Sequence, residues 1–220
     1  MKQPEITPAC VETLLETPFL NVFDLRYAPG RHYYNATRRG ADRLVCVQSE
    51  EDFQSLTPDA VTCVVLLRTP GSEPRLLLSY EYRYPAGRFL LSPPAGLLDQ
   101  EDRSRPEPLF SAALREIREE TGIRAEPTLL RVINPLLFSS PGMTDESNAL
   151  VLALFDLPDL SSLSRAGAES TECFDGFCLL SPAEAREVLR RGRDEHGRFF
   201  SVYTGAALVW FAAGLWQEDA

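Results

Sequence analysis

The sequence predicts an α/β fold preceded by a small N-terminal β-unit. Apolar runs of strand type recur along the chain and alternate with segments of helical periodicity. A polar stretch at residues 49–59 separates a first group of strands from the rest. The 220 residues, 44% of them hydrophobic, suit one large domain or a domain of about 150 residues with a small addition.

The N-terminal unit is expected to hold three short strands at residues 18–27, 32–38 and 43–48, with a turn at 28–31. Three strands cannot bury much apolar surface alone, so we expect this unit to pack on another surface, such as a second subunit. Residues 49–59 are interpreted as a linker. The predicted domains are therefore 1–58 and 59–220.

The second domain begins with a buried-type strand at residues 60–68, a turn and a second strand at 75–83. A charged loop at 99–108 precedes a helix at 108–121. That helix has an apolar stripe made of Phe110, Ala113, Leu114 and Ile117. The other expected elements are strands at 89–92, 128–137, 149–156 and 173–180, a helix that starts at Ser181-Pro182, and a last helix at 203–216.

Composition excludes several classes of function. A net charge of −10 argues against nucleic-acid binding, which needs a basic surface. No apolar run is long enough for a membrane span, and the first residues lack the pattern of a secretory signal. The five cysteines are odd in number and show no CxxC spacing, so we expect reduced thiols and a cytoplasmic protein.

The run from Arg115 to Ile123 gathers three carboxylates at the end of the predicted helix. Glu116, Glu119 and Glu120 fall within an arc of about 100°. Gly122 is an expected C-terminal cap, so the last two acids sit at the negative end of the helix dipole. The repulsion between these neighbouring carboxylates and their position at the negative end of the dipole each cost a few tenths to about 1 kcal/mol. A bound divalent cation would make both effects favourable.

An ordinary solvated helix face, with Arg115 paired to Glu119 one turn on, would also explain this run if it stood alone. The spacing of Ala95-Gly96, Glu107 and Gly122-Ile123 relative to this run favours metal binding instead. Together with Gly96, Glu107 and Gly122, the run resembles the Nudix box, G-x5-E-x7-R-E-U-x-E-E-x-G-U, in which U is aliphatic. From Glu107 onward every fixed position is met, but ten residues rather than five separate Gly96 from Glu107.

Three other segments resemble the ADP-ribose pyrophosphatase branch of the Nudix family. Residues 94–99 are similar to its PAG(L/M)xD segment, Arg83 ends a strand like its QxR(x)P motif, and residues 140–146 are similar to its SPGxxxE loop. The resemblance implies substrate contacts from Arg83, Leu97, Ser140 and Glu146. It also implies a Nudix-type α/β/α sandwich with a mixed sheet, and a homodimer in which the N-terminal β-unit is often exchanged.

The resemblance further implies a metal site for Mg²⁺ or Mn²⁺, ions that prefer hard oxygen ligands. Glu116 and Glu120 are the expected principal ligands. Glu119 would share or bridge and so counts among the catalytic groups, and the carbonyl of Ala95 would add a backbone ligand.

The remaining box residues, Gly96, Glu107, Arg115 and Gly122, are expected to be structural. In particular, Glu107 and Arg115 should form an ion pair that orients the box. The general base is expected in the acidic loop before the last strand, with Glu172 as first choice and Glu169 as second.

These features imply a hydrolase that cleaves the diphosphate of a nucleotide sugar, with ADP-ribose giving AMP and ribose 5-phosphate as the favoured reaction. Two alternatives stay open. One is a Nudix hydrolase of another nucleoside diphosphate derivative, and the other is a non-catalytic module that senses nucleotide sugars. The intact box acids and the lack of a helix-turn-helix extension argue against the second alternative.

Overall fold

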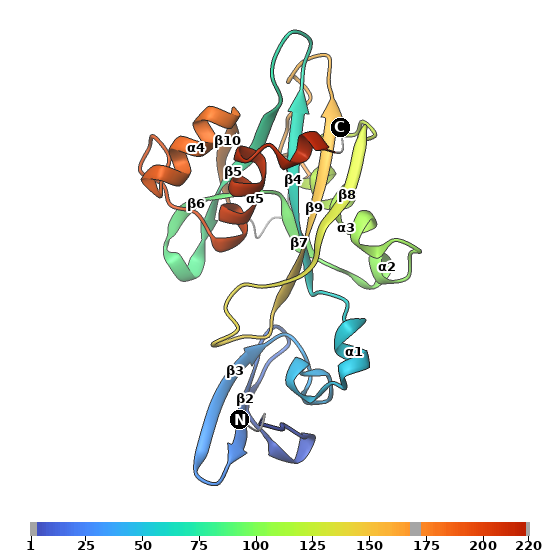
Figure 1. The fold of residues 1–220 in the computed structure, drawn as a ribbon, viewed down its shortest axis with the longest axis vertical. Coiled ribbons are helices and arrows are strands. Elements are labelled where there is room, and N and C mark those ends of the chain that lie inside the picture. Colours follow the sequence, from blue (N-terminus) through green and yellow to red (C-terminus); the bar gives the residue numbers. More distant parts are fainter. Residues whose placement is uncertain (1–3, 168–172, 219–220) are drawn as a thin grey trace. The chain divides into compact units, whose positions relative to one another are not determined.

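The structure is a computed structural model that describes residues 4–167 and 173–218. The chain divides into two units (Figure 1). The first comprises Met1–Asp59 and Leu136–Asn148, and the second comprises Ala60–Pro135 and Ala149–Ala220. The stretch 136–148 thus belongs with the first unit, although it lies outside the predicted N-terminal domain.

The first unit is built on a three-stranded antiparallel sheet in the order β1-β2-β3. Its strands are β1 (Val11–Glu16), β2 (Asn21–Ala28) and β3 (Arg31–Thr37). A small core of Phe23, Leu25 and Leu44 lies beneath them. The predicted strands at 18–27 and 32–38 correspond to β2 and β3.

The predicted strand at 43–48 is wrong, since that segment forms the 3-10 turns η2 (Ala41–Arg43) and η3 (Val45–Val47). Its backbone groups are satisfied locally and by a side chain. The Val47 N–H donates to the Leu44 carbonyl, and the Val45 N–H donates to the Asp145 carboxylate at 3.0 Å. The third strand of the sheet is β1, preceded by η1 (Pro8–Cys10).

The predicted linker at 49–59 also contains regular structure. A short helix, α1 (Glu50–Gln54), begins after Ser49, whose side chain accepts the N–H of Asp52. The cap satisfies one of the backbone donors that a helix start leaves free, so a polar, Ser-led stretch can form a helix here.

The second unit contains most of a seven-stranded sheet in the order β10-β5-β4-β9-β8, with β6 paired to β5 and β7 paired to β4. Leu157 donates its N–H to the carbonyl of Arg68, and Asp59 donates to that of Ser147, so β4 and β9 run parallel. The β4–β5 and β5–β10 pairs are antiparallel, which makes the sheet mixed. The strands are β4 (Ala60–Arg68), β5 (Arg75–Arg83), β6 (Arg88–Ser92), β7 (Ala95–Leu97), β8 (Leu129–Phe138), β9 (Ser147–Asp156) and β10 (Phe174–Leu180).

Helices cover both faces of this sheet (Figure 1). Along β4 and β9 nearly every residue is buried, which requires cover on both sides. Residues such as Val61, Cys63 and Val65 pack against Ala113 and Ile117 of α3. The helices are α2 (Gln100–Arg103), α3 (Pro108–Thr121), α4 (Pro182–Arg191) and α5 (Val202–Ala212), with 3-10 turns η4 (Tyr84–Ala86) and η5 (Leu215–Glu218). The predicted α/β/α sandwich is confirmed. In the part of the chain that the structure describes, no helix combines the length and the apolar character needed to cross a membrane.

The first unit relies on a buried arginine to supplement its small core. Arg39 is 8% exposed. Its guanidinium donates to the Asp59 carboxylate at 2.8 Å and to the Asp145 carbonyl at 2.9 Å. Burial raises the pKa of Asp59, and the charge of Arg39 opposes that rise. The neighbouring Arg38 instead pairs with Glu146 where both side chains are partly exposed.

We expect Arg39→Met to lower the free energy of unfolding by about 3–5 kcal/mol, because it leaves the largely buried carboxylates of Asp59 and Asp145 without a compensating positive charge. The matched change Arg38→Met should cost at most about 1 kcal/mol, since its ion pair is solvated. Urea unfolding of the two variants measures both values. Equal losses of unfolding free energy in the two variants would show that the buried Arg39 contributes no more than the exposed Arg38.

Candidate active site

The three acids of the motif occupy the last two turns of α3. Glu116 is 7% exposed and Glu120 is 4% exposed, whereas the side chain of Glu119 is 39% exposed. The helix ends as predicted at Gly122, which has a φ of 76° that favours glycine. Two buried carboxylates one turn apart are unfavourable unless cations or donors compensate them.

Strand β7 presses its main chain against these carboxylates. The Ala95 N–H donates to Glu120 Oε1 at 3.0 Å. A Cβ at Gly96 would overlap the carboxylate of Glu116, so no other residue fits there without displacing that side chain. The Ala95-Gly96 pair therefore forms a cradle for the α3 acids.

Arg115 connects the parts of the site. Its guanidinium donates to Glu116 at 2.8 Å, to Glu119 at 3.1 Å and to the carbonyl of Leu97 at 2.9 Å. It also donates to Asp102 at 2.8 Å. Burial works against the charge of Arg115, but its hydrogen bonds to Asp102 and the charge of Glu116 raise its pKa on balance. One cation thus donates hydrogen bonds to three carboxylates.

The predicted ion pair between Glu107 and Arg115 is wrong, because Asp102 takes that place. Asp102 is 2% exposed and accepts from both Arg115 and the Ser111 hydroxyl, the latter at 2.9 Å. Burial would raise the pKa of Asp102, but these hydrogen bonds hold it below its ordinary value. Glu107 is exposed and precedes the first turn of α3, where its side chain caps no backbone N–H.

The spacing explains this exchange. Five residues separate Gly96 from Asp102, as the family pattern requires, so the extra residues lie at 103–107, after the acid rather than before it. The charged loop predicted at 99–108 therefore contains α2, which begins with a reciprocal capping box between Asp99 and Asp102. Counting forward from Gly96 and accepting Asp in place of Glu would have identified the residue.

Arg83 lies at the end of β5, as predicted, where it forms an ion pair with Glu81 at 2.7 Å. The Glu81 side chain is 14% exposed, and burial raises its pKa against the opposing effects of Arg83 and Ser92. The sequence prediction missed Glu81. Its position two residues before Arg83, on the same face of the strand, is a signal that could have identified it.

The other predicted residues are distributed over the chain. Leu97 is 45% exposed and contributes its carbonyl to Arg115. Ser140 and Glu146 belong to the first unit, where the Ser140 carbonyl accepts the Met143 N–H and Glu146 pairs with Arg38. Both candidates for the general base, Glu169 and Glu172, lie outside the described residues.

The residue types at this site fit a hard divalent cation. Glu116, Glu119 and Glu120 supply carboxylate oxygens. The main chain of Ala95 and Gly96 lies in contact with Glu120 and Glu116. Among residues 4–167 and 173–218, no three His, Cys, Asp or Glu side chains are arranged to hold an ion directly. The reason is local, since Arg115 and the Ala95 N–H already engage the carboxylates. An ion would therefore compete with Arg115 for Glu116 and Glu119.

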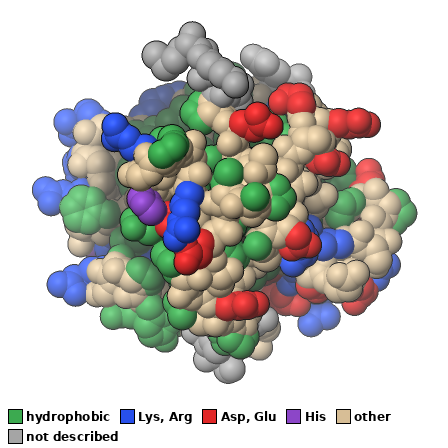
Figure 2. Space-filling model, turned by 90° about the horizontal axis from the view of Figure 1, so that it is seen from below, with side chains coloured by type: hydrophobic (Ala, Val, Ile, Leu, Met, Phe, Trp, Pro, Cys, Tyr) green, Lys and Arg blue, Asp and Glu red, His purple; other side chains and the backbone are tan. Residues whose placement is uncertain are grey.

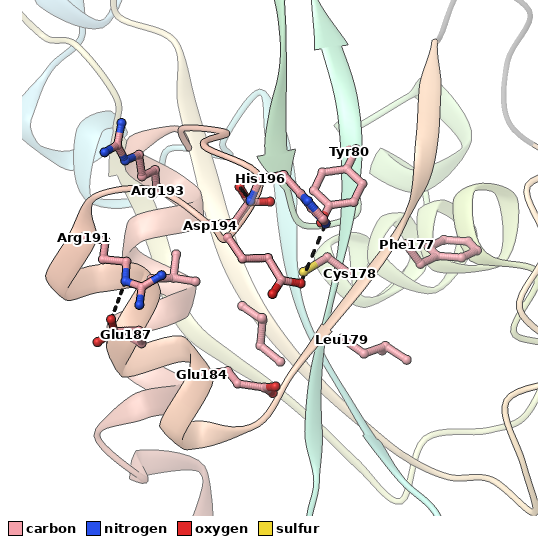
Figure 3. A pocket seen from close by; sticks show the side chains of 13 residues that line it. Tyr80, Phe177, Cys178, Leu179, Glu184, Glu187, Arg191, Arg193, Asp194 and His196 are labelled. Carbon is pink, nitrogen blue, oxygen red and sulfur yellow. Dashed lines mark hydrogen bonds and ion pairs between the residues drawn. The ribbon is translucent and has the colours of Figure 1, made fainter.

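A separate cavity of about 460 Å³ lies between β10, α4 and the loop at 193–196 (Figure 3). Tyr80, Cys178 and Asp194 line it, and none of the α3 acids does. Burial raises the pKa of Cys178, a reactive group only as thiolate. We therefore assign no part of the candidate active site to this cavity.

We expect Asp102→Asn to reduce the catalytic rate of this candidate active site by about 10- to 100-fold, because Arg115 would lose the carboxylate that orients it. The variant should also be less stable at neutral pH. The pKa of Asp102 is lower in the folded chain, so its contribution is present above about pH 4 and is lost as pH falls through the folded value. Urea unfolding should show that the free energies of unfolding of the wild type and of Asp102→Asn differ less at pH 3 than at pH 7.

Glu107→Gln is the matched control for this variant. Both changes remove one carboxylate at an acidic position near the start of α3, but only Asp102 touches Arg115. Glu107→Gln should behave like the wild type in both assays. An equal loss in the two variants would contradict the assignment of Asp102.

Comparison with known proteins places these features in a family. The NUDIX domain model matches residues 56–203. A putative nudix hydrolase 2 of Caenorhabditis elegans is 34% identical over 98 residues, which cover 44% of this chain and 40% of that protein. An ADP-ribose pyrophosphatase of Mycobacterium tuberculosis is 42% identical over 113 residues, which cover 50% of this chain and 49% of that protein. The chain thus spans less than half the length of each of these two relatives.

A solved structure supports the fold over the whole chain. The crystal structure of an ADP compounds hydrolase superposes with a TM-score of 0.63 at 19% identity, covering 100% of this chain and 97% of the other. The domain match spans α3 and its carboxylates, the β7 cradle and the Asp102–Arg115 pair. On this evidence the chain belongs to the NUDIX domain family.

Proposed function

We propose that this protein hydrolyses the diphosphate bond of a nucleoside diphosphate sugar with the help of Mg²⁺ or Mn²⁺. ADP-ribose is the favoured substrate, giving AMP and ribose 5-phosphate. The observation that carries the proposal is the pair of buried carboxylates, Glu116 and Glu120, held against the β7 main chain. The similarity to an ADP-ribose pyrophosphatase supports the choice of substrate.

In this proposal Glu116 and Glu120 would be the principal ligands of the ions, Glu119 would share or bridge, and the Ala95 carbonyl would add a backbone ligand. A bound Mg²⁺ supplies positive charge for the phosphates and makes hydroxide available near pH 7. To free Glu116 and Glu119, the Arg115 guanidinium keeps its bonds to Asp102 and Leu97 and releases the other two.

The chemical step is attack of water on one phosphorus of the diphosphate. A new P–O bond forms, the bond to the bridging oxygen breaks, and the proton of the water passes to a carboxylate. Glu172 is the proposed acceptor and Glu169 is the second candidate. Their segment is flanked by Gly167, which packs on the last turn of α3, and by Phe174, which pairs with Glu81.

Substrate contacts are proposed for Arg83, Leu97, Ser140 and Glu146. Arg83 can bind a phosphate only by exchanging its bond to Glu81, and Glu146 must likewise exchange its bond to Arg38. These two exchanges would make binding of the anionic substrate depend on how strongly each arginine is held.

A homodimer is proposed as the working assembly. Between residues 14 and 34 of the first unit, seven large hydrophobic side chains are at least 38% exposed. Such exposure on a small sheet is typical of a surface that a partner covers. One face of the molecule shows hydrophobic side chains interspersed with charged ones (Figure 2). The seven residues are Leu14, Leu15, Phe19, Leu20, Tyr27, Tyr33 and Tyr34.

The five cysteines are all free, which is compatible with the proposed cytoplasmic location.

We expect Glu120→Gln to lose at least about 100-fold in turnover of ADP-ribose with either Mg²⁺ or Mn²⁺, because it removes a proposed ligand of the ion. Release of AMP across a panel of nucleotide sugars measures the effect. Glu126→Gln, at an exposed position beyond the helix, is the control. Full turnover by Glu120→Gln would refute the metal role, and binding without turnover by the wild type would favour a sensing module.

Glu172→Gln tests the general base separately. We expect kcat to fall by about 100- to 10,000-fold while Mn²⁺ affinity stays unchanged, since a base that touches water need not touch the ion. Titration with Mn²⁺ and steady-state rates supply the two measurements. A normal rate in this variant, with a slow rate in Glu169→Gln, would move the role to Glu169.

A further inference from the structure

One segment outside the motif is fixed against the last turn of the carboxylate helix. The Ser164 N–H donates to the carbonyl of Thr121 at 2.8 Å. Three residues later, a Cβ at Gly167 would lie 2.8 Å from the carbonyl oxygen of Glu119, so the two main chains are in direct contact there. Residues 164–167 are therefore held beside the turn that carries Glu119.

Arg165 projects from this segment over the aromatic residues of β10. Its guanidinium carbon lies 4.5 Å from the ring centre of Phe177 and 5.6 Å from that of Phe174. Phe177 packs into the same hydrophobic cluster as Ile117 of α3. The guanidinium thus lies over aromatic rings of β10, one of which packs against the hydrophobic cluster that includes α3.

The Nε atom of Arg165 is buried and has no hydrogen-bond partner among the described residues. Burial lowers the pKa of Arg165, and the charge of Asp175 only partly opposes this effect. By contrast, Arg83 and Arg115 already bind carboxylates. A buried guanidinium N–H without an acceptor is costly, and the planar set of guanidinium donors matches phosphate oxygens.

We propose that Arg165 binds the diphosphate of the substrate beside the α3 carboxylates, stacked on Phe177. This role rests on the proposed function, since it supplies a cation for the anionic substrate in a site of three glutamates. It is a binding role, so removing the side chain should weaken association and leave the chemical step largely intact. Arg165 would then determine preference for substrates that carry a diphosphate.

The test compares Arg165→Met, Arg165→Lys and the control Arg186→Ala, a change at an exposed position on α4. Methionine keeps the packing on Phe177 without the charge, and lysine restores the charge without the planar donor set. Calorimetric titration with ADP measures binding without turnover. Steady-state rates with ADP-ribose, titration with Mn²⁺ alone and melting temperatures complete the set.

For Arg165→Met we expect the Kd for ADP and the KM for ADP-ribose to rise by about 10- to 100-fold. The kcat should stay within about three-fold and Mn²⁺ binding should be unchanged, since no ligand of the ion is removed. Arg165→Lys should recover part of the loss, and Arg186→Ala should resemble the wild type.

A Kd for ADP within two-fold of the wild-type value in Arg165→Met would overturn the proposal. So would a fall in kcat without a change in KM, or a matching loss of Mn²⁺ binding, because each indicates a different role. If no variant, including the wild type, turns over ADP-ribose, the proposed function fails, whereas the ADP titration still decides the role of Arg165.

Discussion

The hydrogen bonds of Arg115 hold the candidate site together. One guanidinium joins the carboxylates of α3, the main chain of β7 and the turn at α2. Without it, Glu116 would be a buried charge next to two others, an arrangement that costs several kcal/mol in a medium of low polarity. Asp102 accepts from Nε and Nη2 of Arg115, whereas Nη1 donates to Glu116 and Glu119. In the proposed function, a bound ion would replace the positive charge that Arg115 now supplies to Glu116 and Glu119.

Much of the second unit could be predicted from local pattern. The limits of β4 and β5 agree residue for residue with the predicted strands, because long apolar runs bounded by a Pro-Gly turn leave little choice. The helix α3 also agrees, since Pro108 starts it and Gly122 ends it. These elements owe their conformation to residues close by in the sequence.

The first unit shows where local pattern is insufficient. The segment at 43–48 has the composition of a strand, but the Asp145 carboxylate, about a hundred residues away, accepts one of its N–H groups. The strand β1 is mostly exposed, so it lacks the alternation that identifies a half-buried strand. Both errors arise from contacts that a reading of neighbouring residues does not contain.

At the candidate site, too, the motif predicts which residue types are present, whereas their partners depend on the three-dimensional structure. The sequence identified the acids of α3 and the small residues of β7, because their chemistry is explicit in the motif. The motif assigns the partner of Arg115 to Glu107, because Glu107 has the family spacing to the arginine, although its spacing to Gly96 departs from the pattern. Counting from Gly96 makes Asp102 a candidate, and its burial and its place in the α2 capping box then favour it over Glu107. Likewise, the pairing of Arg83 with Glu81 follows from strand geometry rather than from the motif.

The five residues between Asp102 and Pro108 interrupt the motif without disturbing it. Their two ends are anchored, one by the α2 capping box and the other by the start of α3, so the stretch between them can change in length at little entropic cost. A search that demands fixed distances would overlook chains of this kind. One that lets the acidic partner of the arginine float along the sequence would recover them, and the same stretch is a natural point at which to graft a tag or a reporter.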